Sequence, residues 1–161
     1  MPRKRVIKVS LSIKSIDNAI KEIEAFEKKI YDNAEEVVKR AVDFGKETAK
    51  WNLAQYYFTD STDELYNSID GKTERVSETE VNGVIYAGAE HGVFVEAGTG
   101  PVGAGNHPIL GGHRSSGWHY FHPRREEVYY TEGMEARPFM YDTAETLKEK
   151  IVDIAKDVFN E

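Results

Sequence analysis

Five histidines fall within one third of the chain, and their side chains are the clearest candidates for chemistry. They are His91, His107, His113, His119 and His122. Imidazole nitrogens bind Zn²⁺ or Ni²⁺, and three of these side chains would meet if the loop around them folded back. Their spacing matches no zinc motif, and the chain has no cysteine to supply a thiolate. We therefore predict no metal site. The sequence leaves one alternative function open for this loop, which is that of a metal-binding module or a metal-dependent enzyme.

Two other patterns suggest cofactor binding or catalysis, but each lacks an element that it needs. Residues 98–103 read Gly-Thr-Gly-Pro-Val-Gly, which has the spacing of a dinucleotide-binding loop. Residues 104–108, Ala-Gly-Asn-His-Pro, cannot open the helix that such a loop requires. A nucleophile, a base and an acid are present as Ser115 or Ser116, His113 and Glu96. Because no nucleophile elbow surrounds the serines, we predict that the protein is not an enzyme and holds no cofactor.

The composition indicates one folded domain over residues 1–161. Hydrophobic residues make up 40% of the chain and charged residues 30%, which is typical neither of a disordered nor of a membrane protein. The net charge of −7 argues against general nucleic-acid binding, and we expect no sequence-specific nucleic-acid partner. No apolar run approaches the length that spans a bilayer, so we expect no membrane partner. Residues 1–14 form a basic arm with Arg3, Lys4, Arg5, Lys8 and Lys14. This arm is either a solvated terminus or a contact for phosphate or an acidic neighbour.

The first third of the chain predicts a strand followed by a long helix. Apolar and polar residues alternate over 5–13, which favours a half-buried strand, and Ser15 is placed to cap a helix over 15–58. Asn33 and Gly45 lower the helix propensity and predict a kink or a break.

Positions in steps of four and three from residue 16 to residue 51 are apolar except at Glu27 and Thr48, and we call this stripe the seam. Such a seam is typical of a coiled coil or of a long helix on a sheet. Three apolar residues beside the seam widen it, namely Phe26, Val38 and Val42. The wider stripe favours packing on the protein's own sheet over a pure two-helix zipper.

The remainder predicts short strands, a loop and a last helix. Within 65–97 we expect strands at 65–69, 74–76 and 81–86, with Asn82-Gly83 as a turn signal; 93–97 is open between strand and helical turn. Residues 98–135 predict a long, flexible glycine-rich loop that contains a hairpin or strand extension of 119–122 with 127–130. Asp142 and Glu145 form a capping box for a helix over 142–160. The fold class is α+β: a small, mostly antiparallel sheet packed against one long N-terminal helix and a C-terminal helix.

Arg137-Pro138-Phe139 predicts a rigid corner before the last helix. Pro138 restricts the residue before it to extended geometry, and Phe139 is a large apolar residue that would pin the corner. Arg137 is placed to pair with Glu96, although direct contact with a partner protein is also open.

Aromatic residues gather in the second half of the 98–135 loop. They include Trp118, Tyr120, Phe121, Tyr129 and Tyr130. Aromatic side chains are enriched at protein interfaces, but they also fill the cores of small sheets, and the sequence leaves both roles open.

Two short segments together resemble the HK97 gp10-like family of tailed-bacteriophage neck and tail-component proteins. The first is Val93-Phe94-Val95-Glu96-Ala97-Gly98-Thr99, and the second is Ala136-Arg137-Pro138-Phe139-Met140. The order of the expected elements also resembles that of the family. In many members the two motifs lie close together, whereas here residues 100–135 form a long insertion between them.

The resemblance implies a structural virion protein of a phage or prophage. It would act at the head–tail junction, as a neck or tail-completion component, after assembly in the cytoplasm of the bacterial host. Its partners would be other junction or tail proteins and further copies of itself in a ring, and a monomer before assembly is compatible with this. Glu96, Arg137 and Phe139 would hold the scaffold beside Gly98, Thr99 and Pro138, while the 98–135 loop would contact neighbours.

Overall fold

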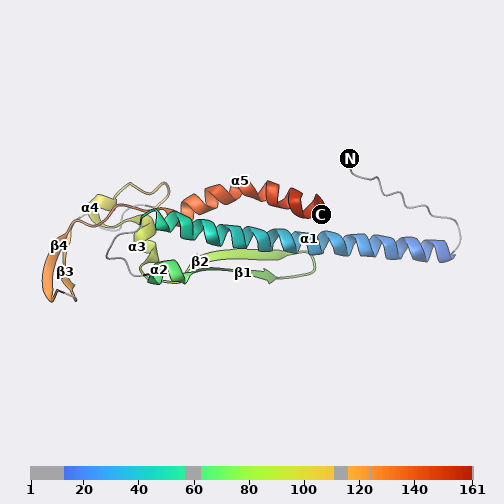
Figure 1. Ribbon diagram of the computed structural model, residues 1–161, viewed down its shortest axis with the longest axis horizontal. Coiled ribbons are helices and arrows are strands. Elements are labelled where there is room, and N and C mark those ends of the chain that lie inside the picture. Colours follow the sequence, from blue (N-terminus) through green and yellow to red (C-terminus); the bar gives the residue numbers. More distant parts are fainter. Residues whose placement is uncertain (1–12, 57–62, 111–115, 124, 161) are drawn as a thin grey trace.

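The computed structural model describes residues 13–56, 63–110, 116–123 and 125–160. It has the expected α+β architecture, with one long helix, two small antiparallel hairpins and a C-terminal helix (Figure 1). Along the chain the elements are α1 (Ile13–Ala54), α2 (Glu64–Ser68), β1 (Ile69–Arg75), β2 (Val81–Ala87), α3 (Gly92–Ala97), α4 (Gly100–Gly103), β3 (Trp118–His122), β4 (Glu127–Thr131) and α5 (Phe139–Asn160).

Helix α1 is the backbone of the molecule. Figure 1 shows it lying between α5 on one side and the β1–β2 hairpin on the other. The two strands pair in antiparallel register from Ile69 opposite Ala87 to Arg75 opposite Val81. The core lies where α1, α2, β1 and the start of α5 meet, and it contains Ala49, Leu53, Leu65, Ile69 and Phe139.

Gly45 lies in the middle of α1, and the helix continues through it without a break. The predicted kink or split at this glycine and at Asn33 was therefore wrong. Gly45 is buried, and a Cβ at this position would overlap the side chain of Ile85 in β2. Glycine at this position lets the helix and the sheet approach closely, which offsets its low helix propensity.

The buried face of α1 coincides with the predicted seam only in part, because Ala41 of the seam is buried but most of the other buried residues lie beside the seam. The buried apolar residues in the second half of the helix are Ala41, Val42, Ala49 and Leu53, while the seam residue Trp51 is 64% exposed. A straight helix has 3.6 residues per turn, so a stripe that repeats every 3.5 residues drifts around it and leaves the core. Val42, which widens the seam, faces Gly71 and Gly83 of the sheet, so the prediction of packing on the protein's own sheet was correct.

The predicted ends of the long helix need correction. The strand expected over 5–13 falls almost wholly on residues 1–12, which lie outside the described residues, and Ile13 is helical. Among the described residues α1 starts two positions before Ser15, so Ser15 is not its N-cap, and α1 ends at Ala54 rather than at residue 58.

The region of short strands contains more helix than expected. Residues 64–68 form α2, so the strand predicted at 65–69 was wrong except for Ile69, which begins β1. Asn82 and Gly83 pair with Glu74 and Thr73 inside the ladder, while the turn itself is closed by Val76 N–H and the Glu80 carbonyl at 2.9 Å. The strand predicted at 81–86 was correct, and the ambiguous residues 93–97 belong to α3.

Helix α5 begins at Phe139, three residues before the predicted start. Asp142 therefore lies in its first turn, where its N–H donates to the Pro138 carbonyl at 2.9 Å, and the predicted capping box was wrong. Phe139 is 1% exposed in the core, so the prediction of a buried aromatic at this corner was correct. No helix in the described part of the chain is long and apolar enough to cross a membrane.

Candidate functional site

The buried carboxylate of Glu96 joins the two sequence motifs. Glu96 lies near the end of α3, and its Oε2 and Oε1 atoms accept the N–H groups of Met140 and Tyr141, each at 2.9 Å. These amides belong to the first turn of α5, where no carbonyl of the same helix can accept them. Glu96 therefore caps α5 from another element, and its negative charge faces the positive end of the helix dipole.

His107 is the third partner of this carboxylate. Its Nε2 lies 3.2 Å from Glu96 Oε1, and its Nδ1 accepts the N–H groups of Ile109 and Leu110 at 3.1 and 2.8 Å. Because Nδ1 accepts two hydrogen bonds, the proton of the neutral ring is on Nε2 and is donated to Glu96. The ring is buried and meets the Tyr141 ring edge-on, with centroids 5.7 Å apart. His107 thus ties the 104–110 segment to the start of α5.

The predicted corner at Arg137-Pro138-Phe139 is fixed through its main chain. The N–H of Arg137 donates to the Val95 carbonyl at 2.9 Å, and the N–H of Phe139 donates to the Arg137 carbonyl at 2.8 Å. These bonds place the second motif directly against the first. Burial lowers the pKa of the Arg137 guanidinium from its usual value. The ion pair of Arg137 with Glu96 stays a prediction, because the described bonds of the Glu96 carboxylate go to α5 and His107.

The buried side chains of Asn52 and Thr143 also support the first turn of α5. The sequence did not predict this pair. Asn52 of α1 donates from Nδ2 to the Thr143 hydroxyl at 3.0 Å, and that hydroxyl donates to the Phe139 carbonyl at 2.6 Å. Both side chains are buried, so each would be costly if left unpaired. The signal in the sequence was weak: a polar residue on the buried side of a long helix.

Gly98 and Thr99 close the base of the 100–133 segment. Thr99 and Met134 form a two-bond bridge, with Thr99 N–H donating to the Met134 carbonyl at 2.9 Å and Met134 N–H to the Thr99 carbonyl at 3.1 Å. Gly98 has a φ of +73°, and a Cβ on it would lie 2.6 Å from the Ala136 nitrogen. Glycine is required there by both the dihedral angle and the close backbone contact.

Strands β3 and β4 form a hairpin that extends from one end of the molecule, and we call it the outer hairpin (Figure 1). The predicted hairpin of 119–122 with 127–130 was therefore correct. One face carries Trp118, Tyr120, His122 and Tyr129, and the rings of Tyr120 and Tyr129 are 6.2 Å apart. The other face is exposed throughout and consists of His119, Phe121, Val128 and Tyr130.

This exposed face bears on the two roles left open for the aromatic residues. Phe121 is 59% exposed and Tyr130 is 57% exposed, so neither fills a core in the isolated chain. On the other face, the Tyr120 ring lies 6.2 Å from the Tyr129 ring, and Trp118 is half-buried. A solvent-facing set of aromatic residues on a two-stranded hairpin is the type of surface that binds another protein.

The structure separates the histidines that could have met around a metal ion. His107 is bonded to Glu96, and His119 and His122 point to opposite faces of β3, while His113 lies outside the described residues. Among the described residues, no group of three histidine, aspartate or glutamate side chains is close enough to hold a metal ion.

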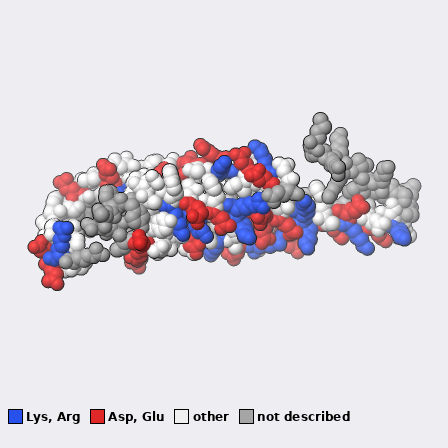
Figure 2. Space-filling model, viewed as in Figure 1, with Lys and Arg blue, Asp and Glu red and all other residues white. Residues whose placement is uncertain are grey.

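Acidic and basic side chains are interspersed along the helical body on the face shown in Figure 2. On that face the described residues form no extended positive patch of the kind that tracks a phosphate backbone. Comparison with known family models, with curated proteins and with solved structures finds no match to this chain.

Proposed function

We propose that this protein is a structural component of the head–tail junction of a tailed bacteriophage or prophage. It acts as a neck or tail-completion protein, by ring assembly rather than by catalysis. The proposal starts from the resemblance of residues 93–99 and 136–140 to the HK97 gp10-like family. It is supported by the way these two segments fit together in the fold.

The observation that carries the proposal is the joint made by Glu96. The two motifs are about forty residues apart in the chain, yet a single buried carboxylate of the first caps the helix that follows the second. The main-chain bond from Arg137 to Val95 holds them in register. The motif residues therefore have a common structural purpose, which is to present the insertion between them from a rigid base.

The outer hairpin is the contact arm in this proposal. An isolated two-stranded hairpin is marginally stable in water, so it gains stability when its faces or edges meet another surface. Its base is fixed by the bridge between Thr99 and Met134, and its exposed face carries Phe121 and Tyr130. In a ring, such an arm meets a different surface on the next subunit, which is a heterologous contact.

The test is a lysogen in which this reading frame is stopped, followed by electron microscopy of the induced particles. The proposal expects DNA-filled heads and separate tails, with infectivity restored by the wild-type gene supplied in trans. Complementation with Phe121→Ser combined with Tyr130→Ser should fail, while Val152→Ser, which changes an exposed apolar residue of α5, should succeed. Normal infectious particles from the stopped lysogen would refute the proposal.

A further inference from the structure

The amino-terminal part of α1 extends past the rest of the fold. Figure 1 shows it continuing beyond the carboxyl end of α5 and beyond the turn between β1 and β2. We call residues 13–30 the overhang. Every residue from 20 to 30 is exposed. The overhang nevertheless carries six large apolar side chains, each between 40% and 81% exposed: Ile13, Ile16, Ile20, Ile23, Phe26 and Ile30.

The isoleucines of the overhang continue the buried face of the same helix. At 3.6 residues per turn, Ile16, Ile20 and Ile23 project from the same side of α1 as the buried Gly45 and Ala49. Around Gly45 that side is covered by Ile85 of β2 and Leu147 of α5. The overhang thus has a core-type face at a place that its own sheet and α5 do not reach (Figure 1). A contiguous apolar stripe of this length is typical of an interface.

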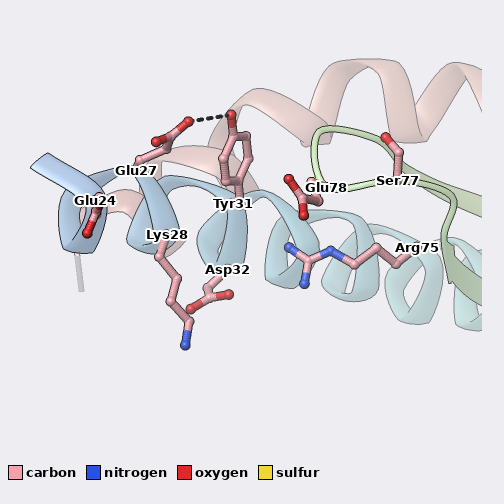
Figure 3. Close-up of a pocket in the computed structure, with 8 residues that line it drawn as sticks. All are labelled: Glu24, Glu27, Lys28, Tyr31, Asp32, Arg75, Ser77 and Glu78. Carbon is pink, nitrogen blue, oxygen red and sulfur yellow. Dashed lines mark hydrogen bonds between the residues drawn. The ribbon is translucent and has the colours of Figure 1, made fainter.

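An acidic groove lies at the inner end of the stripe, where the overhang meets the β1–β2 turn. Its volume is about 520 Å³, and its lining includes four carboxylates and two cations, drawn in Figure 3: Glu24, Glu27, Asp32, Glu78, Lys28 and Arg75. Arg75 is already paired with Glu35 at 3.4 Å. The groove therefore favours a positively charged group beside the apolar stripe.

We propose that the overhang binds the overhang of a second copy of this chain, with the two helices antiparallel. The isoleucines of the two stripes pack against each other, and the amino-terminal end of each helix lies at the acidic groove of the other copy. Such a contact is isologous, because the same surface is used on both copies. The stripe's steps of four and three are the spacing with which two helices interlock.

The antiparallel orientation follows from the shape of the fold. A parallel partner helix would run along the stripe into the space that the first copy's own α5 and β1–β2 already occupy around Gly45. An antiparallel partner runs the other way, so each folded body lies beyond the end of the opposite overhang. Pairing centred on Ile20 places residue 13 of one copy opposite residue 27 of the other.

Charge supports the same orientation. The amino-terminal end of a helix carries the positive end of its dipole, and Lys14 lies in the first turn of α1. The twelve residues before Ile13 add four basic residues and no acid to the sequence. Antiparallel pairing brings this positive end toward Glu24 and Glu27, which line the partner's groove. The proposal stands on the surfaces of the chain itself and does not depend on a place in a phage particle.

The first test is analytical ultracentrifugation of the full chain over a range of concentrations. We expect a reversible dimer with a dissociation constant in the micromolar range, weakened by salt. Ile16→Glu combined with Ile23→Glu should raise that constant at least about 100-fold, because it places unpaired charges in an apolar contact. At concentrations well below that constant, where both proteins are monomeric, the two should have the same melting temperature, since both residues are exposed in the single copy. Trp51→Ser, which changes an exposed apolar residue outside the overhang, should leave the dimer intact.

Cysteine cross-linking tests the orientation without background, because the chain has no cysteine of its own. Ile20→Cys should cross-link to itself between copies, and a mixture of Ile13→Cys and Glu27→Cys should give mixed dimers. Ala25→Cys, on the opposite side of the helix, should not react between copies. Cross-linking of Ile13→Cys to itself, with none in the mixture, would show a parallel pair and overturn the stated arrangement.

Two results would overturn the proposal as a whole. One is a monomer at about 200 µM with no cross-link at Ile20→Cys, since a contact of micromolar strength would be saturated there. The other is a monomer in which the Ile20→Cys thiol reacts rapidly only after residues 2–12 are deleted. That result would assign the stripe to the chain's own amino-terminal arm. Neither result bears on the lysogen experiment, so failure of this proposal and failure of the proposed function are distinguishable.

Discussion

The imidazole of His107 donates a hydrogen bond from Nε2 to Glu96 Oε1 across 3.2 Å, and both side chains are buried. The pair links a loop segment to a helix start through one carboxylate. With two amides of α5 and one imidazole as donors, that carboxylate is satisfied without a water molecule. A group so fully bonded is suited to holding the fold in place rather than to binding a substrate.

Removing this carboxylate should weaken the whole fold. Glu96→Ala deletes the cap of α5 and leaves His107 without its acceptor, so we expect a loss of about 2–4 kcal/mol in the free energy of unfolding. Glu96→Gln keeps one accepting oxygen and should cost about 1–2 kcal/mol. Urea unfolding followed by circular dichroism measures both. Glu90→Ala, a neighbouring exposed glutamate, is the control and should be near neutral. Equal stability of Glu96→Ala and wild type would show that Glu96 does not cap α5.

His107→Ala should have a smaller and more local effect. The two amide bonds from α5 to Glu96 remain, so we expect a loss of about 1–2 kcal/mol. The N–H groups of Ile109 and Leu110 lose their acceptor, and their hydrogen exchange should become faster. Hydrogen exchange read by NMR tests this directly. If those two amides exchange at the wild-type rate in the variant, the ring does not organise the 104–110 segment.

Patterns that depend on local sequence predicted the fold well. The strand at 81–86 and the hairpin between residues 119 and 130 were both readable from alternation. The burial of Phe139 followed from a large apolar residue at a proline-fixed corner. Each of these features depends on a few residues that are neighbours in the sequence.

Features decided by distant contacts were not predicted. The cap of α5 comes from Glu96, more than forty residues earlier, so the local pair Asp142 and Glu145 pointed to the wrong start. Gly45 suggested a broken helix because its reason, the approach of Ile85, lies on another element. Residues 65–68 begin with Leu65 and Tyr66, and this short segment forms a helix rather than a strand, with Leu65 packed in the core. His107 carried no local sign that its partner would be Glu96.

Tyr31 provides a test of pH dependence in the groove of Figure 3. Its hydroxyl donates to Glu27 Oε1 at 3.2 Å, and this hydrogen bond raises the pKa of the Tyr31 phenol above its usual value. The protonated phenol is favoured in the folded state, so its contribution to stability is present below the usual tyrosine pKa and is lost as the pH rises through the folded value. NMR titration of labelled tyrosine rings should show a raised pKa for Tyr31, and Glu27→Ala should lower it toward the ordinary range, because alanine removes both the hydrogen-bond acceptor and the charge. An unchanged Tyr31 pKa in that variant would exclude Glu27 as the cause.

Gly133 is a sensitive point at the base of the outer hairpin. Its φ is +101°, and a Cβ there would overlap the carbonyl of Thr99, so Gly133→Ala should break the bridge between Thr99 and Met134. We expect a loss of about 2–3 kcal/mol in the free energy of unfolding. Gly105→Ala is a matched control: its φ is +78°, but nothing lies within 4 Å of the added atom. Thermal melts of the two variants should differ clearly, and a similar small loss in both would mean that the bridge contributes little.

The exposed face of the outer hairpin should matter for assembly and hardly at all for folding. Phe121→Ser combined with Tyr130→Ser removes two aromatic side chains that are more than half exposed, so each substitution should change the free energy of unfolding by no more than about 0.5 kcal/mol. If the hairpin is a contact arm, the same variant should fail to restore infectivity in the stopped lysogen, because aromatic anchors contribute much of the energy of protein interfaces. Comparing urea unfolding with particle titre separates the two effects. A variant that folds normally and restores full titre would show that this face contacts no essential neighbour, and the arm's role would then have to lie in its strand edges.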